Sequence, residues 1–163
     1  MSLAILELYD LVGAQMAGVA PTLRFFTPTD EFWSVMSRFK NTPIFEFGAG
    51  TGETVEEARA LGFRWSGCDH RTGPETMLRG VHQLNALRVP LTEGMTAIAC
   101  RPDHSGWVER ALRRALNHNA NAIYVSKGRN AARDIGDLLL DRPFEMIESV
   151  GAEGEAMWIF HAD

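Results

Sequence analysis

The sequence predicts an α/β protein with a single doubly wound, mostly parallel seven-stranded sheet, preceded by N-terminal helices and closed by an antiparallel hairpin. Two observations support this. From residue 43 onward, short apolar runs that favour strands alternate with amphipathic helical patterns. Near the end, the strand-like runs 144–150 and 156–161 are joined only by Gly151-Ala-Glu-Gly154. That connection is too short for a crossover helix, so these two strands must run antiparallel.

The bulk composition is that of one ordinary globular domain. The chain has 163 residues, of which 45% are hydrophobic and 23% charged, and a formal net charge of −5. This charge provides no overall positive field for nucleic acid. Cys68 and Cys100 have no metal-ligand spacing, so we expect no metal site. In the absence of a secretory leader or a membrane-length apolar segment, we expect a cytoplasmic protein with no membrane partner.

Two helices are expected before the first strand. Residues 3–17 carry apolar side chains at helical spacing. In Thr27-Pro-Thr-Asp30, Thr27 is the expected N-cap and Pro28 the first helical residue. The apolar face of this second helix consists of Phe32, Val35, Met36 and Phe39.

The central segment of the chain is Pro43-Ile-Phe-Glu-Phe-Gly-Ala-Gly-Thr-Gly52. Its apolar half predicts a strand and its glycines a tight turn, and Val55, Ala58 and Leu61 then predict one face of a helix. Strand, glycine turn and helix start in this order form a nucleotide-binding βα turn, where glycine lets a ligand approach the backbone closely. The alternative is a glycine-rich turn that binds no ligand.

The spacing and the charge of this turn indicate the kind of ligand. A dinucleotide fingerprint reads G-x-G-x-x-G, whereas its last position here is Glu53. The Glu53 carboxylate would also stand at the helix N-terminus, where dinucleotide enzymes bind a pyrophosphate. Both features favour a ligand with a cationic amino-acid end and no phosphate.

A second strand, residues 63–69, is expected to end in Asp69. This residue follows Gly48 by about twenty residues, the usual distance for an acid that binds ribose hydroxyls from the end of the neighbouring strand. The alternative for Asp69 is a role in forming the turn only.

The residues Glu46-Phe-Gly-Ala-Gly-Thr-Gly52 resemble the first motif of class I S-adenosylmethionine (SAM)-dependent methyltransferases, acidic-x-Gly-x-Gly-x-Gly. The resemblance implies one methyltransferase-like domain over 1–163, with a helical segment at 1–42 and a Rossmann-like core at 43–163. It implies SAM as the cofactor, with Asn85 accepting a hydrogen bond from the adenine amino group. The cofactor-binding residues expected in this way are Glu46, Gly48, Ala49, Gly50, Gly52, Asp69, His70, Asn85 and Ala86.

The rest of the pattern completes the sheet. Further strands are expected at 81–84, 95–100 and 122–126. Ser105 and Asn130 are expected to cap the two helices that follow the last two of these strands. The core face expected for the first helix is Val108, Ala111, Leu112, Ala115 and Leu116, and that of the second helix includes Ile135, Leu138 and Leu139.

The loop Arg101-Pro-Asp-His104 follows the fourth strand. In open α/β sheets the ligand lies beyond the carboxyl ends of the strands, where the strand order reverses, so we expect this loop beside the bound ligand. Asp103 and His104 are candidate general bases, and Arg101 is a candidate for binding a substrate carboxylate or phosphate. The alternative is a stiff, capped turn without a catalytic role.

Two classes of function follow. The first is a SAM-dependent methyltransferase acting on a small molecule or an exposed protein group, with Arg101, Asp103 and His104 at its catalytic site. The second is a SAM-binding or empty methyltransferase-like domain that acts as a partner or regulator without turnover; a nucleotide-binding oxidoreductase is a third interpretation. The negative charge weighs against a nucleic-acid substrate, as does the absence of the Asn/Asp-Pro-Pro-Tyr/Phe pattern associated with base methylation. The sequence leaves the oligomeric state open, a homo-oligomer included.

Overall fold

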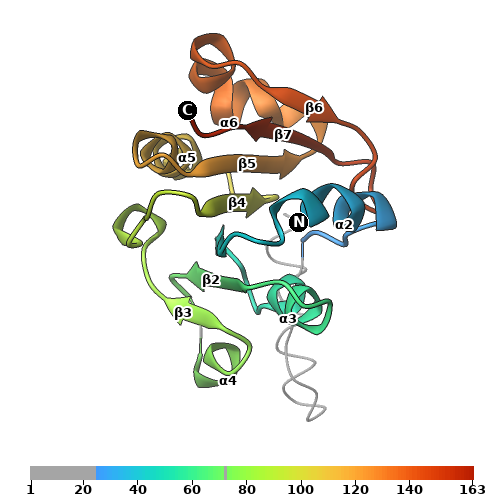
Figure 1. Ribbon diagram of the computed structural model, residues 1–163, viewed down its shortest axis with the longest axis vertical. Coiled ribbons are helices and arrows are strands. Elements are labelled where there is room, and N and C mark those ends of the chain that lie inside the picture. The colour runs from blue at the N-terminus through green and yellow to red at the C-terminus, as the bar shows by residue number, and fades with distance from the viewer. Residues whose placement is uncertain (1–24, 72) are drawn as a thin grey trace, which may run out of the picture.

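The computed structural model describes residues 25–71 and 73–163, so the helix expected at 3–17 lies outside the described residues. Seven strands form one sheet in the order β3-β2-β1-β4-β5-β7-β6 (Figure 1). The strands are β1 (Ile44–Phe47), β2 (Trp65–Asp69), β3 (Val81–Gln83), β4 (Thr96–Cys100), β5 (Asn121–Ser126), β6 (Glu145–Ile147) and β7 (Ala156–Phe160). Strands β1 to β5 pair in parallel, whereas β7 runs antiparallel to both β5 and β6. The predicted fold class is therefore confirmed.

Helices cover both faces of this sheet. They are α2 (Asp30–Met36), η1 (Ser37–Phe39), α3 (Glu53–Ala60), α4 (Pro74–Met77), η2 (Ala86–Arg88), α5 (Trp107–Asn117) and α6 (Gly128–Asp141). One hydrophobic core lies between the sheet and α5 and α6, and a second lies between the sheet and α2, η1 and α3. Strand β4 contributes to both cores, with Ala97 and Ala99 on one face and Ile98 and Cys100 on the other.

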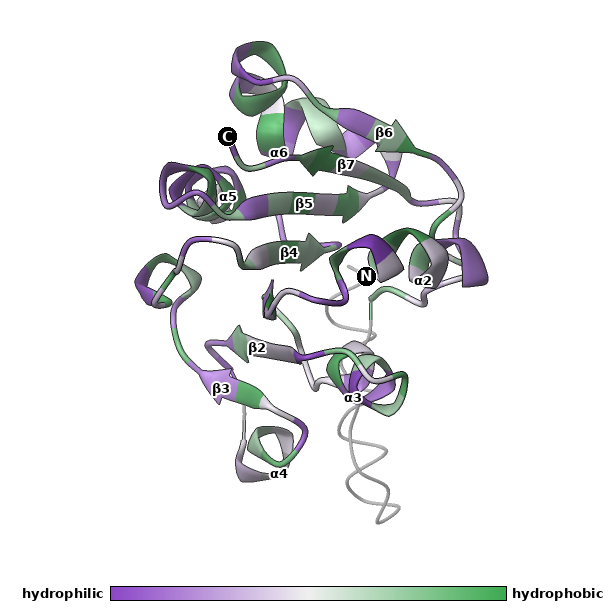
Figure 2. Ribbon diagram, in the orientation of Figure 1, coloured by the Kyte–Doolittle hydropathy of each residue, from purple (hydrophilic) through white to green (hydrophobic). Residues whose placement is uncertain are grey.

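Burial on both faces explains the composition of the inner strands. Every residue of β4 and of β7 is buried, whereas two of the three residues of the edge strand β3 are exposed. Figure 2 shows the corresponding hydrophobic colouring along β4 and β7. Continuous apolar runs are typical of strands covered by helices on both sides. Among the described helices, none is long and apolar enough to cross a membrane.

The order of the strands reverses between β1 and β4. From β1 the chain moves outward through α3, β2 and α4 to β3, and it then returns to place β4 on the other side of β1. The loops that follow β1 and β4 therefore leave the sheet from adjacent strands. This switch point is where ligands bind in open α/β sheets.

The start of α2 differs from the prediction that Thr27 caps it. The helix begins at Asp30 with Thr29 as its N-cap. Pro28 instead forms an antiparallel bridge with Gly151, and the Thr29 amide donates a hydrogen bond to the Val150 carbonyl at 3.0 Å. This pairing with the turn before β7 keeps residues 27–29 extended, which the local sequence does not reveal.

The caps predicted for α5 and α6 are also wrong. Gly106, with a φ of 86°, is the N-cap of α5, and the Ser105 hydroxyl donates to the side chain of Asp103. Lys127 precedes α6, and Asn130 lies inside its first turn. The helices themselves are confirmed, and so is the predicted core face of α5, all five residues of which are buried.

Candidate functional site

The glycine turn joins β1 to α3. Gly48, Gly50 and Gly52 have φ angles of 67°, 59° and 87°, in the left-handed region that other residues rarely adopt. A Cβ added to Gly48 would lie 3.3 Å from the indole ring of Trp107, and one added to Gly52 would lie 2.7 Å from Cγ2 of Val81. Glycine is thus required here both by backbone conformation and by close packing.

Asp69 ties this turn to the end of β2. Its Oδ2 accepts a hydrogen bond from the Gly50 amide at 3.0 Å, and its Oδ1 accepts one from the Arg71 amide at 2.9 Å. The Ala49 amide also donates to the Cys68 carbonyl, at 2.8 Å. Asp69 therefore shapes the turn, as the structural alternative stated. Each carboxylate oxygen keeps a further acceptor position, so binding a ribose hydroxyl stays a prediction.

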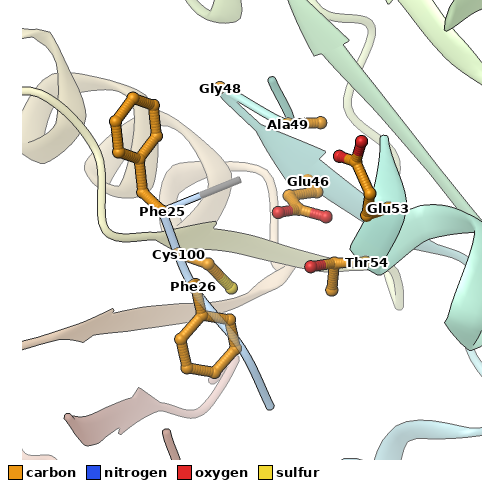
Figure 3. Close-up of a pocket in the computed structure, with 8 residues that line it drawn as sticks. All are labelled: Phe25, Phe26, Glu46, Gly48, Ala49, Glu53, Thr54 and Cys100. Atoms are coloured by element: carbon orange, nitrogen blue, oxygen red, sulfur yellow. The ribbon is translucent and has the colours of Figure 1, made fainter. Parts of the chain in front are cut away.

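A small cavity adjoins the glycine turn, and Figure 3 shows the carboxylates of Glu46 and Glu53 beside it. Glu46 is only 3% exposed and accepts a hydrogen bond from Nε1 of Trp65 at 3.1 Å. Glu53 accepts from the Thr51 hydroxyl at 2.6 Å and from Arg79 at 3.1 Å. The cavity volume of about 20 Å³ is that of one or two water molecules. The residues that line it are Phe25, Phe26, Glu46, Gly48, Ala49, Glu53, Thr54 and Cys100.

The other predicted cofactor residues lie further along the same edge of the sheet. His70 is exposed, with its Nδ1 3.8 Å from Oδ1 of Asp69. Asn85 is the N-cap of η2, where its Oδ1 accepts a hydrogen bond from the Leu87 amide at 2.9 Å, and Ala86 is the first residue of η2. The Asn85 oxygen that we expected to bind adenine thus already has a donor within the chain.

The loop after β4 packs against the glycine turn. Its Asp103 accepts hydrogen bonds from Nε1 of Trp107 at 2.7 Å and from the Ser105 hydroxyl at 2.5 Å, and the Trp107 ring covers Gly48. Partial burial raises the pKa of Asp103, but these hydrogen bonds outweigh burial and hold it below its usual value. A carboxylate with a lowered pKa is a poor base, so the geometry of Asp103 fits the alternative of a capped turn.

Arg101 lines a second cavity and does not line the small one. Its backbone has a φ of 46°, and its guanidinium donates a hydrogen bond to the Phe25 carbonyl at 2.9 Å and pairs with Glu153. Because Cys100 lines the small cavity and Arg101 lines a second one, the end of β4 separates two cavities.

His104 is held by a buried carboxylate. Its Nδ1 lies 2.8 Å from Oδ1 of Asp134, and the Tyr124 hydroxyl donates to Oδ2 of Asp134 at 2.5 Å. The Asp134 side chain is 2% exposed, whereas that of His104 is 41% exposed. Burial, together with the Asp134 carboxylate, raises the pKa of Tyr124, so this hydroxyl remains a donor. An imidazole oriented by a carboxylate in this way is the arrangement of a general base.

Asp134 is the residue that the sequence analysis missed. It lies on the buried face of α6 together with Ala131, Ile135 and Leu138. An acidic residue in the apolar face of a helix is the signal that could have found it, since a buried carboxylate requires a partner.

The second cavity lies where β4 and β5 end and α6 begins. It is open and has a volume of about 480 Å³. All six of its lining residues are polar: Arg101, His104, Lys127, Arg129, Asn130 and Arg133. Two of the three predicted catalytic residues, Arg101 and His104, therefore share one cavity, and Asp103 does not line it.

Comparison with solved structures identifies the fold. A putative O-methyltransferase from Klebsiella pneumoniae is similar over 96% of this chain and 90% of its own, with a TM-score of 0.61 and 12% identity. The O-methyltransferase TomG from Streptomyces achromogenes, solved in complex with SAM, is similar over 96% and 89%, with a TM-score of 0.58 and 12% identity. Magnesium protoporphyrin IX methyltransferase from Synechocystis, also solved with SAM, is similar over 81% and 78%, with a TM-score of 0.58 and 11% identity.

Sequence comparison does not extend this structural similarity to a family. No protein-family model matches the chain, and neither does any curated protein. At 10–16% identity the structural similarity establishes the fold and not the activity. The chain has the Rossmann-like fold of class I SAM-dependent methyltransferases.

Proposed function

We propose that this protein is a SAM-dependent methyltransferase that acts on a small molecule or a protein side chain. The observation that carries the proposal is the His104–Asp134 pair, which opens into the cavity at the ends of β4 and β5, and β4 is one of the two strands at the switch point of the sheet. Asp134 is buried and needs a partner, and it finds one in a histidine that is exposed where an acceptor would lie. A pair arranged only for stability would not require an open cavity on the histidine side.

The residues around the glycine turn suit SAM chemically. The carboxylates of Glu46 and Glu53 match a cationic amino-acid end, and Asp69 has acceptor positions for ribose hydroxyls. Bound SAM would supply a methyl group activated by a positively charged sulfur. Because the small cavity measures only about 20 Å³, binding requires a rearrangement; Phe25, which lines the cavity and is 42% exposed, is the side chain that we expect to move.

His104 is the proposed base. The hydrogen bond between Nδ1 and Asp134 orients the ring. Nε2 then accepts a proton from the hydroxyl or amine of the acceptor, while the oxygen or nitrogen of that group forms its bond to the methyl carbon. The electron pair of the broken carbon–sulfur bond stays on sulfur. Asp134 then stabilises the imidazolium, and Arg101 binds an anionic group of the acceptor. Positioning of the acceptor contributes much of the acceleration, as in other displacements between bound reactants.

Calorimetry with SAM and its demethylated product, S-adenosylhomocysteine, tests the cofactor. We expect a measurable binding heat and a raised thermal midpoint with both ligands. No heat and no stabilisation at millimolar ligand would exclude the proposal, and stronger stabilisation by NAD would support an oxidoreductase. Transfer from tritiated SAM to a small-metabolite pool, a protein lysate and nucleic acid then identifies the class of acceptor.

A non-catalytic SAM-binding or regulatory domain is the second candidate. The small cavity favours it, because its volume in this conformation is only that of one or two water molecules. Tight SAM binding without labelling of any pool would support this alternative.

A further inference from the structure

The open cavity between β4, β5 and α6 has an unusual charge for this protein. Four of its lining residues carry a permanent positive charge, Arg101, Lys127, Arg129 and Arg133. Among the residues that the structure describes, two carboxylates pair with them, those of Glu153 and Asp134. The cavity is thus positive by two charges before His104 is counted, in a chain whose formal net charge is −5.

The two carboxylates compensate different parts of the lining. Glu153 pairs with Arg101 and lies 3.4 Å from the Lys127 ammonium. Asp134 lies 2.8 Å from His104 and 3.5 Å from Nε of Arg133. Among the described residues, no carboxylate lies within ion-pair distance of Arg129, which is exposed on the first turn of α6. The uncompensated charge therefore lies at the α6 side of the cavity.

The start of α6 contributes basic side chains and no opposing charge. The helix is kinked at Ile135 and has no acidic residue in its first turn, and Lys127, its N-cap, lines the cavity together with Arg129 and Asn130. Asn130 accepts a hydrogen bond from Arg133 at 3.1 Å through its Oδ1. The Arg133 guanidinium, which is 57% exposed, is therefore oriented within the lining and still accessible to a ligand.

We propose that this cavity binds the phosphate group of a small phosphorylated molecule, which is the methyl acceptor. A phosphate monoester carries a charge of about −1.5 to −2 at pH 7, which matches the excess positive charge of the lining. Planar guanidinium groups bind phosphate oxygens in pairs. The volume of about 480 Å³ is that of a small-molecule site. Because none of the described lining residues is aromatic, the cavity offers no ring among them on which a base would stack, and a free metabolite fits better than a nucleic-acid strand.

This proposal names the acceptor of the proposed methyltransferase and rests on that function for the reaction. The anion site itself does not depend on it. A phosphate held by Arg129 and Arg133 would place the rest of the acceptor toward Arg101 and His104, which line the same cavity. Glu153, whose pKa is lowered by the charges of Arg101 and Lys127, competes with a bound anion for these two cations.

Calorimetry of the full chain with pyrophosphate and with ribose 5-phosphate at low ionic strength tests the site. We expect both to bind, and Arg129→Ala and Arg133→Ala each to weaken binding about fivefold to twentyfold. Glu153→Gln should tighten binding severalfold, because it removes the competing carboxylate. The matched control is Arg113→Ala: this arginine is 35% exposed, pairs with Asp141 at 3.0 Å and does not line the cavity, so affinity should stay unchanged.

Three outcomes would overturn the proposal. If neither the wild-type chain nor Glu153→Gln binds either compound at millimolar concentration, the cavity is not an anion site. An equal loss in Arg113→Ala would mean that binding follows general charge and not this lining. If poly(U) binds more tightly than ribose 5-phosphate and loses affinity in Arg129→Ala, the site serves a nucleic-acid backbone instead.

The same titrations separate this proposal from the proposed function. Pyrophosphate binding with no SAM binding would leave the anion site standing and reject the methyltransferase. SAM binding without phosphate binding would keep the methyltransferase and reject the phosphorylated acceptor.

Discussion

The two sides of the loop after β4 carry opposite charge. Around the glycine turn the side chains that face the small cavity include the carboxylates of Glu46 and Glu53, whereas the cavity on the other side is lined by Lys127 and three arginines. The chain as a whole is acidic, and its net charge predicts neither region. This contrast indicates how one strand end could hold two reactants of opposite sign: a cationic methyl donor on the acidic side and an anionic acceptor on the basic side.

The two sides also differ in what maintains them. The acidic side is narrow and built largely from backbone, with left-handed glycines packed against Trp107 and Val81. The basic side is open and built from long side chains, two of them directly after β4 and β5 (Arg101 and Lys127) and two on the first turns of α6 (Arg129 and Arg133). Substitutions should therefore act on the first through sterics and on the second through charge, and each prediction below separates these effects.

The largest effect is expected from Gly50→Val. Gly50 has a φ of 59°, so valine adds backbone strain of about 1–3 kcal/mol and also blocks the approach of a ligand to the turn. We expect SAM affinity to fall at least about a hundredfold. Gly94→Val is the control, because Gly94 has a φ of 81° but an added Cβ meets no atom within 4 Å. Calorimetry should show normal SAM binding in the control, and equal losses would attribute the effect to stability alone.

His104→Asn and Asp134→Asn probe the basic side. Once a methyl acceptor is found, we expect His104→Asn to lower kcat about a hundredfold, and Asp134→Asn about tenfold, because the ring loses its orientation. KM for SAM should hardly change. The matched control is His118→Asn, since this histidine is exposed and its Nδ1 lies 2.8 Å from the Arg114 carbonyl oxygen. Unchanged transfer in both variants would mean that positioning alone produces the rate.

Asp69→Asn should weaken SAM binding without affecting the basic cavity. The substitution preserves the shape of the side chain but removes one or two charge-assisted hydrogen bonds, each worth about 1.5–3 kcal/mol before water compensates. Affinity for SAM should fall about tenfold or more, while pyrophosphate binding stays as in the wild type. An unchanged SAM affinity would leave Asp69 with its role in the turn only.

The smallest effect is expected from Asp103→Asn. This substitution changes the hydrogen bonds that Asp103 accepts from Ser105 and Trp107. Because the pKa of Asp103 is lowered in the folded protein, its contribution is present above the unfolded pKa of about 3.9 and is lost as pH falls through the folded pKa. The variant should lose up to about 1 kcal/mol at neutral pH, since the group is partly exposed. Urea unfolding at several pH values measures this difference, which should disappear once the pH lies below the folded pKa of Asp103. Asp137→Asn, at an exposed position of α6, is the matched control.

The sequence by itself determined the features that depend on neighbouring residues. Three left-handed glycines between a strand and a helix, an acid at the end of β2 and the buried face of α5 were all predicted and are confirmed. So was the antiparallel hairpin, because a short turn leaves no other pairing. Each of these follows from backbone sterics or from the period of a helix or a strand, which are local properties.

Only the tertiary structure decided the features that join distant parts of the chain. Pro28 leaves the helix for a bridge with Gly151, and His104 meets Asp134 thirty positions later in the chain. The separation of acidic and basic side chains likewise follows from the order of β1, β4 and β5 in the sheet. Side chains at different strand ends come together only when the strand order is known, because sequence periodicity gives the face of each element and not its neighbour.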